Sequence, residues 1–239
     1  SALCVAVLKA LNCLFQTQFS NKHIAILAQK VERNYIGVSG GIMDQLVSSI
    51  GVHGKAFFLD CLTLKYELLD IPKNWIFHLV DSEDQRNLRN SAYNERFNQL
   101  KLAENFLGVE YLGRTKKESL KKEIFKDEII YKRAHHVITE NERVIEAKHF
   151  MNKNNINKFG ELMNLSHISY SSDFDASTKD VDLLTKRSLE CGAVGSRLTG
   201  GGFGGFTVSL IEKKDYEQWY KKMTKYYSND KFLMCNGTL

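Results

Sequence analysis

The feature that most constrains the fold is a glycine-dense segment near the C-terminal end of the sequence. Residues 199–205 contain five glycines, and apolar runs with strand character, 193–198 and 206–211, lie on either side. So many glycines cost a large backbone entropy on folding, and a tight hairpin accounts for only one or two of them. We therefore predict a loop between two strands whose backbone N–H groups approach a charged ligand closely.

The same segment formally matches G-x-G-x-x-G through Gly200, Gly202 and Gly205. A dinucleotide-binding fold requires a helix directly after this motif, whereas an apolar strand pattern follows here. A protein-kinase glycine loop does lie between strands, but that family also needs H-R-D and D-F-G motifs, which this sequence does not contain. Both interpretations are therefore disfavoured.

A second informative segment, residues 40–45, places Asp44 just after a glycine pair. Its apolar neighbours predict a partly buried carboxylate. Asp44 is either a helix N-terminal carboxylate stabilised by the dipole or a base that faces a hydroxyl group. Glu32, twelve residues earlier, is either a surface helix residue or a ligand for Mg²⁺, which favours one or two carboxylates plus phosphate oxygens. Residues 37–41 match G-x-S-x-G, but a helical pattern precedes them instead of the strand that a nucleophile elbow needs.

Composition narrows the class of protein. The 239 residues carry a net charge of +5, and the lysines alternate with acidic residues at helical spacing. We therefore expect solvated helix faces and no nucleic-acid binding. No apolar run is long enough to span a membrane, so we expect no membrane association. Five well-separated cysteines without a C-x-x-C pair favour a reducing, cytoplasmic compartment. The first residue is not Met, so upstream targeting stays open.

Periodicity predicts an α+β fold in which helices and strands are partly segregated. Predicted helices lie at 3–15, 22–31, 43–50, 93–106, 129–151, 156–170, 181–191 and 215–227. Predicted strands lie at 55–60, 65–69, 76–81, 193–198, 206–211 and 232–235.

Taken together, four segments resemble the galactokinases, members of the GHMP small-molecule kinase superfamily. Residues 41–45 are similar to the catalytic aspartate segment of that family, and 91–96 to its S-x-Y-N-x-R segment. Residues 133–140 resemble the R-A-x-H-V-x-x-E helix, and 195–205 the third GHMP motif in its phenylalanine form. The match runs through the whole chain in the family's order.

The resemblance implies a GHMP-kinase-like fold, with an incomplete N-terminal domain over residues 1–70 and a ferredoxin-like α+β domain over 71–239. It also implies ATP and Mg²⁺ as cofactors, galactose as the substrate, phosphorylation of the sugar C1 hydroxyl, and a monomer. Asp44 would be the general base, or at least the anion that orients the sugar C1 hydroxyl, and Glu32 would hold the metal. The implied sugar contacts are Gly41, Tyr93, Gly200 and Gly201, and the implied nucleotide contacts are Ser1 and Gly202.

Two family segments are not found in this sequence: G-R-x-N-x-I-G-E-H-x-D-Y, and most of the serine-rich phosphate loop. We therefore expect this chain alone to phosphorylate sugar poorly, because those segments supply positioning and charge. Two alternatives remain open. One is a GHMP kinase for N-acetylgalactosamine, arabinose or galacturonate, and the other is a non-catalytic sensor of galactose and ATP.

Overall fold

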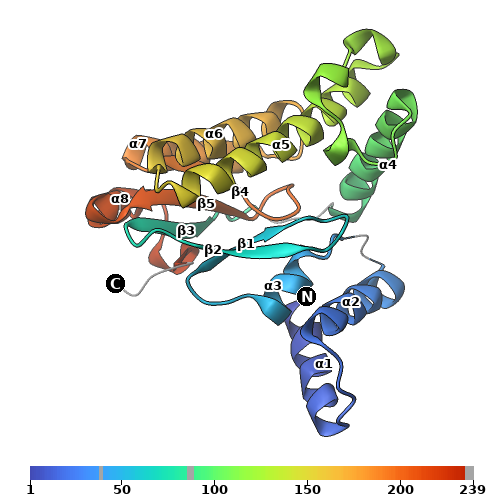
Figure 1. The fold of residues 1–239 in the computed structure, drawn as a ribbon. Helices are drawn as coiled ribbons and strands as arrows, with labels where there is room; N and C mark the ends of the chain where they lie inside the picture. Colours follow the sequence, from blue (N-terminus) through green and yellow to red (C-terminus); the bar gives the residue numbers. More distant parts are fainter. Residues whose placement is uncertain (38–39, 85–88, 235–239) are drawn as a thin grey trace. The chain divides into compact units, whose positions relative to one another are not determined.

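The structure, a computed structural model, describes residues 1–37, 40–84 and 89–234, and for a few of these, including Tyr93, only the backbone. The chain divides into an N-terminal unit, Ser1–Ile71, and a C-terminal unit, Pro72–Leu239 (Figure 1). We describe each unit by itself. The domain boundary expected between residues 70 and 71 stays a prediction.

The N-terminal unit consists of helices followed by a hairpin. Its elements are α1 (Ala2–Leu14), α2 (Asn21–Val31), the π-helical turn η1 (Glu32–Ile36), α3 (Met43–Ile50), β1 (Lys55–Leu59) and β2 (Tyr66–Asp70). The two strands pair antiparallel, with Lys55 opposite Asp70. The hydroxyl of Ser20 accepts a hydrogen bond from the His23 N–H (3.2 Å) and so begins α2 as an N-cap.

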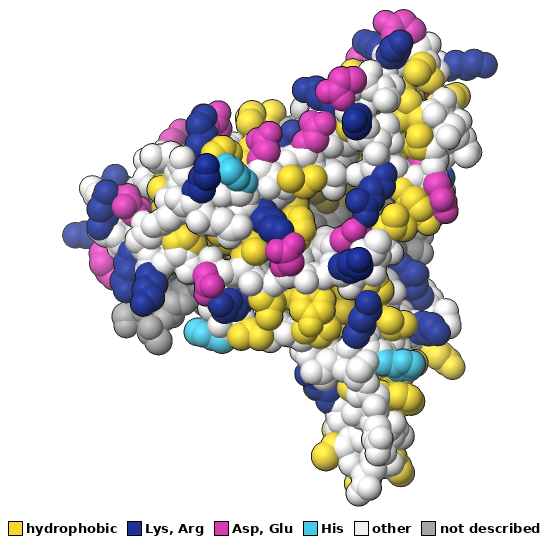
Figure 2. All heavy atoms as spheres, in the orientation of Figure 1, with side chains coloured by type: hydrophobic (Ala, Val, Ile, Leu, Met, Phe, Trp, Pro, Cys, Tyr) yellow, Lys and Arg dark blue, Asp and Glu magenta, His cyan; other side chains and the backbone are white. Residues whose placement is uncertain are grey.

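The core of this unit is small. Its fully buried apolar side chains come mostly from one face of α2 and from single turns of α1 and α3; they are Val5, Ile24, Ala25, Ala28, Ile42 and Leu46. The other side of α1 leaves Leu3, Val7, Leu11 and Leu14 exposed, and Figure 2 shows hydrophobic side chains on the surface of this part of the molecule. The sequence of α1 is apolar nearly all round, a pattern typical of a buried helix, but this face of α1 is exposed.

The C-terminal unit is built around a four-stranded antiparallel sheet of order β4-β5-β3-β6. Its strands are β3 (Trp75–Asp81), β4 (Gly195–Leu198), β5 (Phe206–Glu212) and β6 (Phe232–Met234), and its helices are α4 (Arg89–Leu107), α5 (Glu128–Asn152), α6 (Ile156–Ser172), α7 (Lys179–Cys191) and α8 (Tyr216–Met223). Three short 3₁₀ turns, Leu112–Arg114, Lys117–Ser119 and Lys122–Ile124, connect α4 to α5. If the helices α4–α7 between β3 and β4 are counted as one helical connection, the order is the β-α-β-β-α-β of a ferredoxin-like domain. The predicted α+β fold class is confirmed.

Successive side chains of β3 point to opposite faces of the sheet, and helices pack on both faces. Ile76 and Val80 point into a core with Leu184 of α7 and Trp219 of α8. Trp75, on the opposite face of the strand, packs on Phe159 of α6 with ring centroids 5.0 Å apart. Helix α8 ends at Met223, four residues earlier than expected, and a turn follows it.

Two glycines set the distance between α6 and β4. A side chain on Gly160 would lie 2.6 Å from the Val194 carbonyl oxygen, and one on Gly195 would lie 2.7 Å from the Gly160 Cα. The helix and the strand therefore meet backbone to backbone at this point. No described helix is long and apolar enough to cross a bilayer.

Candidate active site

Three polar side chains from separate segments of the N-terminal unit form a cluster, which we call the carboxylate cluster: Ser1, Glu32 and Gln45. The Ser1 hydroxyl donates to Glu32 Oε2 (3.2 Å), and Gln45 Nε2 donates to the same oxygen (2.8 Å). Gln45 Nε2 also lies 3.2 Å from the Ser1 hydroxyl. The structure thus brings together two residues predicted for the metal and the nucleotide, Glu32 and Ser1.

The cluster offers oxygen atoms to a cation, and one positive group is already near it, since the terminal ammonium of Ser1 lies 3.2 Å from Glu32 Oε1. Ser1 precedes α1, yet its hydroxyl makes no capping bond to the helix and turns to Glu32 instead. Gln45 is buried, and its Oε1 has no hydrogen-bond partner within the described part of the chain. A carboxylate and a hydroxyl supply the oxygen donors that Mg²⁺ prefers, and phosphate oxygens and water complete such sites. Among the described residues, no group of three or more His, Cys, Asp or Glu side chains could hold a metal by itself.

The Gly40–Asp44 segment is anchored to the end of α2. The Gly40 carbonyl accepts hydrogen bonds from Gln29 Nε2 (3.2 Å) and from Arg33 Nε and Nη2 (3.2 and 2.9 Å). Gly41 is exposed, and a side chain added to it would meet nothing within 4 Å. The backbone of Gly41 is therefore open to a ligand, and no packing contact explains its glycine.

Asp44 lies in the first turn of α3, next to the Gln45 that touches Glu32. Its side chain is exposed, so the expectation of a partly buried carboxylate was wrong. Of the apolar neighbours that suggested burial, Ile42 and Leu46 are buried. Met43 and Val47 are exposed, as Asp44 is. The predicted base and the predicted metal ligand thus belong to one region of the N-terminal unit.

The glycine loop, residues 199–205, closes the β4–β5 hairpin of the C-terminal unit. Gly200, Gly202, Gly204 and Gly205 have positive φ angles, between 84° and 104°, a region that side chains rarely adopt. Local geometry therefore accounts for more of these glycines than the one or two that we had attributed to a tight hairpin.

The first three glycines of the loop differ in their surroundings. Gly200 and Gly201 are exposed, so their backbone is available to a ligand. Gly202 is buried, and a side chain there would lie 2.6 Å from the Ala176 carbonyl oxygen. Packing thus explains Gly202, and its predicted nucleotide contact stays a prediction.

Two other predictions are not tested. The side chain of Tyr93, in α4, lies outside the described part of the structure, as do Val38 and Ser39 of the G-x-S-x-G match. A common active site would require Asp44 and the glycine loop to share one cleft. They belong to separate units, so this convergence stays a prediction.

The R-A-x-H-V-x-x-E segment lies in the first half of α5, and its polar side chains are buried or partly buried in the C-terminal unit. His136 Nδ1 lies 3.0 Å from the Ser169 hydroxyl, and its ring stacks on Phe174; burial lowers the pKa of His136 to about 4. Glu140 binds Arg197 (3.0 Å) and Arg143 (2.7 Å). Burial would raise the pKa of Glu140, but Arg197, Ser166 and Arg143 outweigh it and hold that pKa below its ordinary value.

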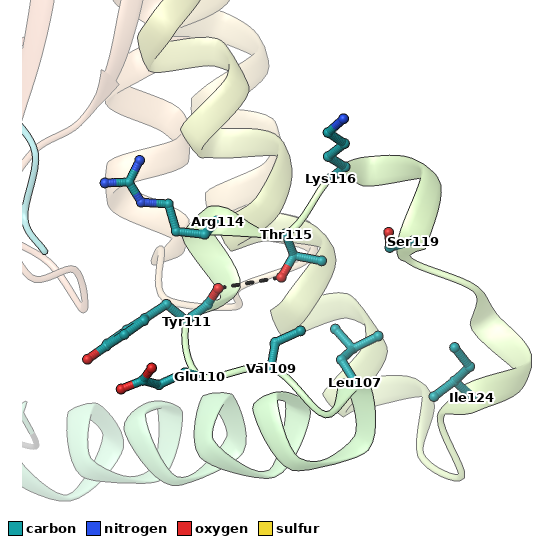
Figure 3. Close-up of a pocket in the computed structure, with 9 residues that line it drawn as sticks. All are labelled: Leu107, Val109, Glu110, Tyr111, Arg114, Thr115, Lys116, Ser119 and Ile124. Carbon is teal, nitrogen blue, oxygen red and sulfur yellow. Dashed lines mark hydrogen bonds between the residues drawn. The ribbon is translucent and has the colours of Figure 1, made fainter.

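A cavity of about 550 Å³ lies beside the 3₁₀ turns between α4 and α5 (Figure 3). Leu107 and Val109 line it, and the side chains of Arg114 and Lys116 extend away from them. The Thr115 hydroxyl closes the local turn on the Tyr111 carbonyl (3.4 Å). No functional role had been predicted for the residues that line this cavity.

Two models of known protein families match this chain. The model for the GHMP kinases N terminal domain matches residues 1–52, and the model for GHMP kinases C terminal matches 147–229. The two matches together span more than half of the chain, in the expected order. The chain belongs to the GHMP kinases.

Within this family, the chain is similar to galactokinase from Lactococcus lactis, whose crystal structure was determined with galactose. The two are 31% identical with a TM-score of 0.91, and the match covers 97% of this chain and 63% of that chain. The predicted resemblance to galactokinases is therefore confirmed. This chain spans less than two thirds of the length of that relative.

More distant relatives share the fold alone. L. major mevalonate kinase, solved with R-mevalonate, is 17% identical with a TM-score of 0.63 and covers 98% of this chain and 64% of its own. Homoserine kinase from Cytophaga hutchinsonii is 14% identical with a TM-score of 0.56, covering 96% and 61%.

Proposed function

We propose that this chain carries the catalytic carboxylate, the metal-side carboxylate and the glycine loop of an ATP-dependent galactokinase. The observation that carries the proposal is the likeness to a galactokinase over 97% of the chain. It is supported by the place of Asp44 in the first turn of α3, directly before the Gln45 that binds Glu32, because phosphoryl transfer to a hydroxyl uses a base and a cation in one site.

In the proposed reaction, the C1 hydroxyl oxygen of α-D-galactose attacks the γ-phosphorus of ATP, and the bond from that phosphorus to the ADP oxygen breaks. The hydroxyl proton passes to the Asp44 carboxylate, and the products are galactose 1-phosphate and ADP. Gly41 and Tyr93 would hold the sugar. Gly200 and Gly201 would line the sugar and phosphate side with backbone N–H groups.

Ser1 and Glu32 would hold Mg²⁺, which neutralises the charge of the β- and γ-phosphates when it is bound. The first turn of α1 supports this assignment, because the Ser1 hydroxyl leaves its N–H groups uncapped and such groups favour phosphate. Gly202 is retained as a neighbour of the nucleotide, although packing already explains it. A reducing compartment also fits, since Cys4, Cys13, Cys61 and Cys191 are free.

The test combines binding with turnover. Thermal stabilisation by galactose and by MgATP reports binding, and γ-³²P-labelled ATP reports product at rates far below normal turnover. We expect Asp44→Asn to abolish product formation while it leaves galactose binding within about twofold, because the group removed acts on the proton rather than on the ring. Ser48→Asn, an exposed change on the same helix, is the matched control.

Each outcome separates the candidate functions. Product that depends on Asp44 supports the galactokinase proposal. Stabilisation by both ligands with no product even at this sensitivity favours the non-catalytic sensor. Faster turnover of N-acetylgalactosamine, arabinose or galacturonate changes the substrate. Turnover that survives Asp44→Asn contradicts the role of this carboxylate.

A further inference from the structure

Two buried arginines of the C-terminal unit, Arg96 and Arg133, hold the segment that in turn holds the glycine loop. We infer that they form a clamp that sets the conformation of this loop, so that Arg96 is a positioning residue for the proposed kinase. The effect on catalysis rests on the proposed function, whereas the clamp itself does not. Nothing in the assigned roles of Asp44, Glu32 or the loop glycines includes either arginine.

The two arginines bind the linker between α6 and α7. Arg96 Nε donates to the Phe174 carbonyl (2.8 Å), and its Nη2 donates to the Asp175 carbonyl and carboxylate (2.8 Å each). Arg133 Nη2 donates to the same carboxylate (3.1 Å), and its Nη1 donates to the Asp173 carbonyl. The planar forks of two arginines thus fix three successive residues of the linker.

The linker in turn contacts the glycine loop. The next residue, Ala176, is fully buried, and its carbonyl oxygen accepts a hydrogen bond from the Phe203 N–H (2.7 Å). Gly202 packs against the same carbonyl, leaving no room for a side chain. A shift of the linker would therefore move the middle of the loop with it.

Arg96 also contacts the glycine loop directly. The Arg96 guanidinium carbon lies 5.8 Å from the centre of the Phe203 ring, within the range of a cation–π interaction. Phe203 has a φ of 57°, in the left-handed region. Such a conformation persists only where the surroundings hold it. Arg96 thus acts on the loop from two sides, through Ala176 and through the Phe203 ring.

Both arginines are buried, so the clamp depends on complete pairing. Burial and the neighbouring Arg96 lower the pKa of Arg133, and Gln99 accepts from both side chains (3.3 Å from Arg96 and 3.0 Å from Arg133). A lysine carries the same charge but lacks the planar fork, so it cannot reach two carbonyls and a carboxylate at once. Arg96→Lys therefore removes positioning while it keeps the charge.

The experiment is amide hydrogen exchange of the full 239-residue chain, read residue by residue by NMR. We expect Arg96→Lys to speed the exchange of the Phe203 N–H at least tenfold, with the β5 amides of Ser209 and Leu210 unchanged. Arg143→Lys is the control, because Arg143 lies in the same helix as Arg133 but pairs with Glu140. We expect the control to leave Phe203 exchange unchanged.

Two results would overturn the clamp: Phe203 exchange that stays the same in Arg96→Lys, or acceleration spread equally over β5, which is what a merely structural arginine would cause. If Arg96→Lys does not fold, Phe203→Leu decides from the other side, since it removes the ring contact alone. We expect the same selective acceleration in the neighbouring loop amides, and its absence counts against the clamp.

A kinetic measurement tests the consequence for the proposed kinase. We expect Arg96→Lys to lower kcat at least tenfold while the KM for galactose changes less than threefold, with Arg143→Lys close to wild type. Equal losses in the two variants would refute the positioning role. Absence of binding and turnover in the wild type would remove the proposed function but leave the exchange result standing, so the two failures are distinguishable.

Discussion

The two units of the chain differ in how their apolar surface is used. In the C-terminal unit, α7 and α8 pack on one face of the sheet and α6 on the other, around large side chains such as Trp75 and Trp219. In the N-terminal unit, the core is a few small and medium side chains along α2, and one side of α1 is apolar and exposed. The N-terminal unit therefore carries the predicted reactive carboxylates on elements with a small buried core, whereas the C-terminal unit holds the glycine loop on elements with a large one. This contrast predicts how each unit responds to substitution.

The largest expected effect is in the C-terminal core. Leu184 is fully buried and Leu183, its neighbour in α7, is 42% exposed. We expect Leu184→Ala to lower the free energy of unfolding by about 3 kcal/mol, because it removes buried methyl groups and leaves a cavity. Leu183→Ala, the control, should cost less than about 1 kcal/mol. Urea denaturation measures both, and equal costs would break the description of this core as tightly packed.

The next effect compares the glycines of the two units. Gly202→Ala should cost about 2 kcal/mol, because it combines a φ of 84° with a clash against the Ala176 carbonyl oxygen. Gly41→Ala should leave stability nearly unchanged, since its added methyl group meets nothing within 4 Å. The comparison also separates packing from ligand contact, because Gly41→Ala should weaken galactose binding without any loss of stability.

A smaller effect tests the two sides of α1. Val5 is 2% exposed and Val7 is 49% exposed. We expect Val5→Ala to cost roughly 1.5 kcal/mol, for two buried methyl equivalents, and Val7→Ala to cost a few tenths at most. Circular dichroism followed through thermal unfolding reads both. A large cost at Val7 would show that this side of the helix is covered in solution.

The last comparison is the pH dependence of the C-terminal unit. Burial lowers the pKa of His78 and of His136 to about 4. The unfolded chain binds these protons near the ordinary value of about 6.5, so folding is most stable above that pH and weakens as the pH falls from about 6.5 towards 4. We expect Tm to drop over this window and His136→Phe to flatten the slope. His149→Gln, which removes an exposed imidazole, is the control, and an unchanged slope in His136→Phe would count against this cause.

Much of the fold could be predicted because its local signals agree with its tertiary contacts. Helices such as α6 and α7 were foreseen to within two residues because their apolar periodicity is regular and Gly192 ends α7 in a left-handed conformation. The end of α8 was misplaced because Tyr226 and Tyr227 continue the apolar pattern, although they lie beyond the helix against Arg187. Periodicity alone does not tell a side chain that packs in a helix from one that packs after it.

The candidate site could be predicted only in part, and for a different reason. Asp44 was predicted because it follows a glycine pair, and Glu32 was predicted through the resemblance to galactokinases. Gln45, which joins Glu32 to Ser1, carries no such signal. The arginine clamp was likewise hidden, since Arg96 and the linker that it binds are 78 and 79 residues apart. Contacts at such separation are set by the tertiary fold and leave no trace in local spacing.

The backbone contact between Gly160 and Gly195 has a consequence for how the last motif is understood. Gly195 opens the glycine-rich motif, yet it faces a helix and not the loop. Gly195 must be a glycine because any larger side chain would push the helix α6 away from the strand β4. A motif that looks like one signature therefore merges two separate demands, one architectural and one aimed at a ligand, and intolerance to substitution at its first position says nothing about phosphate.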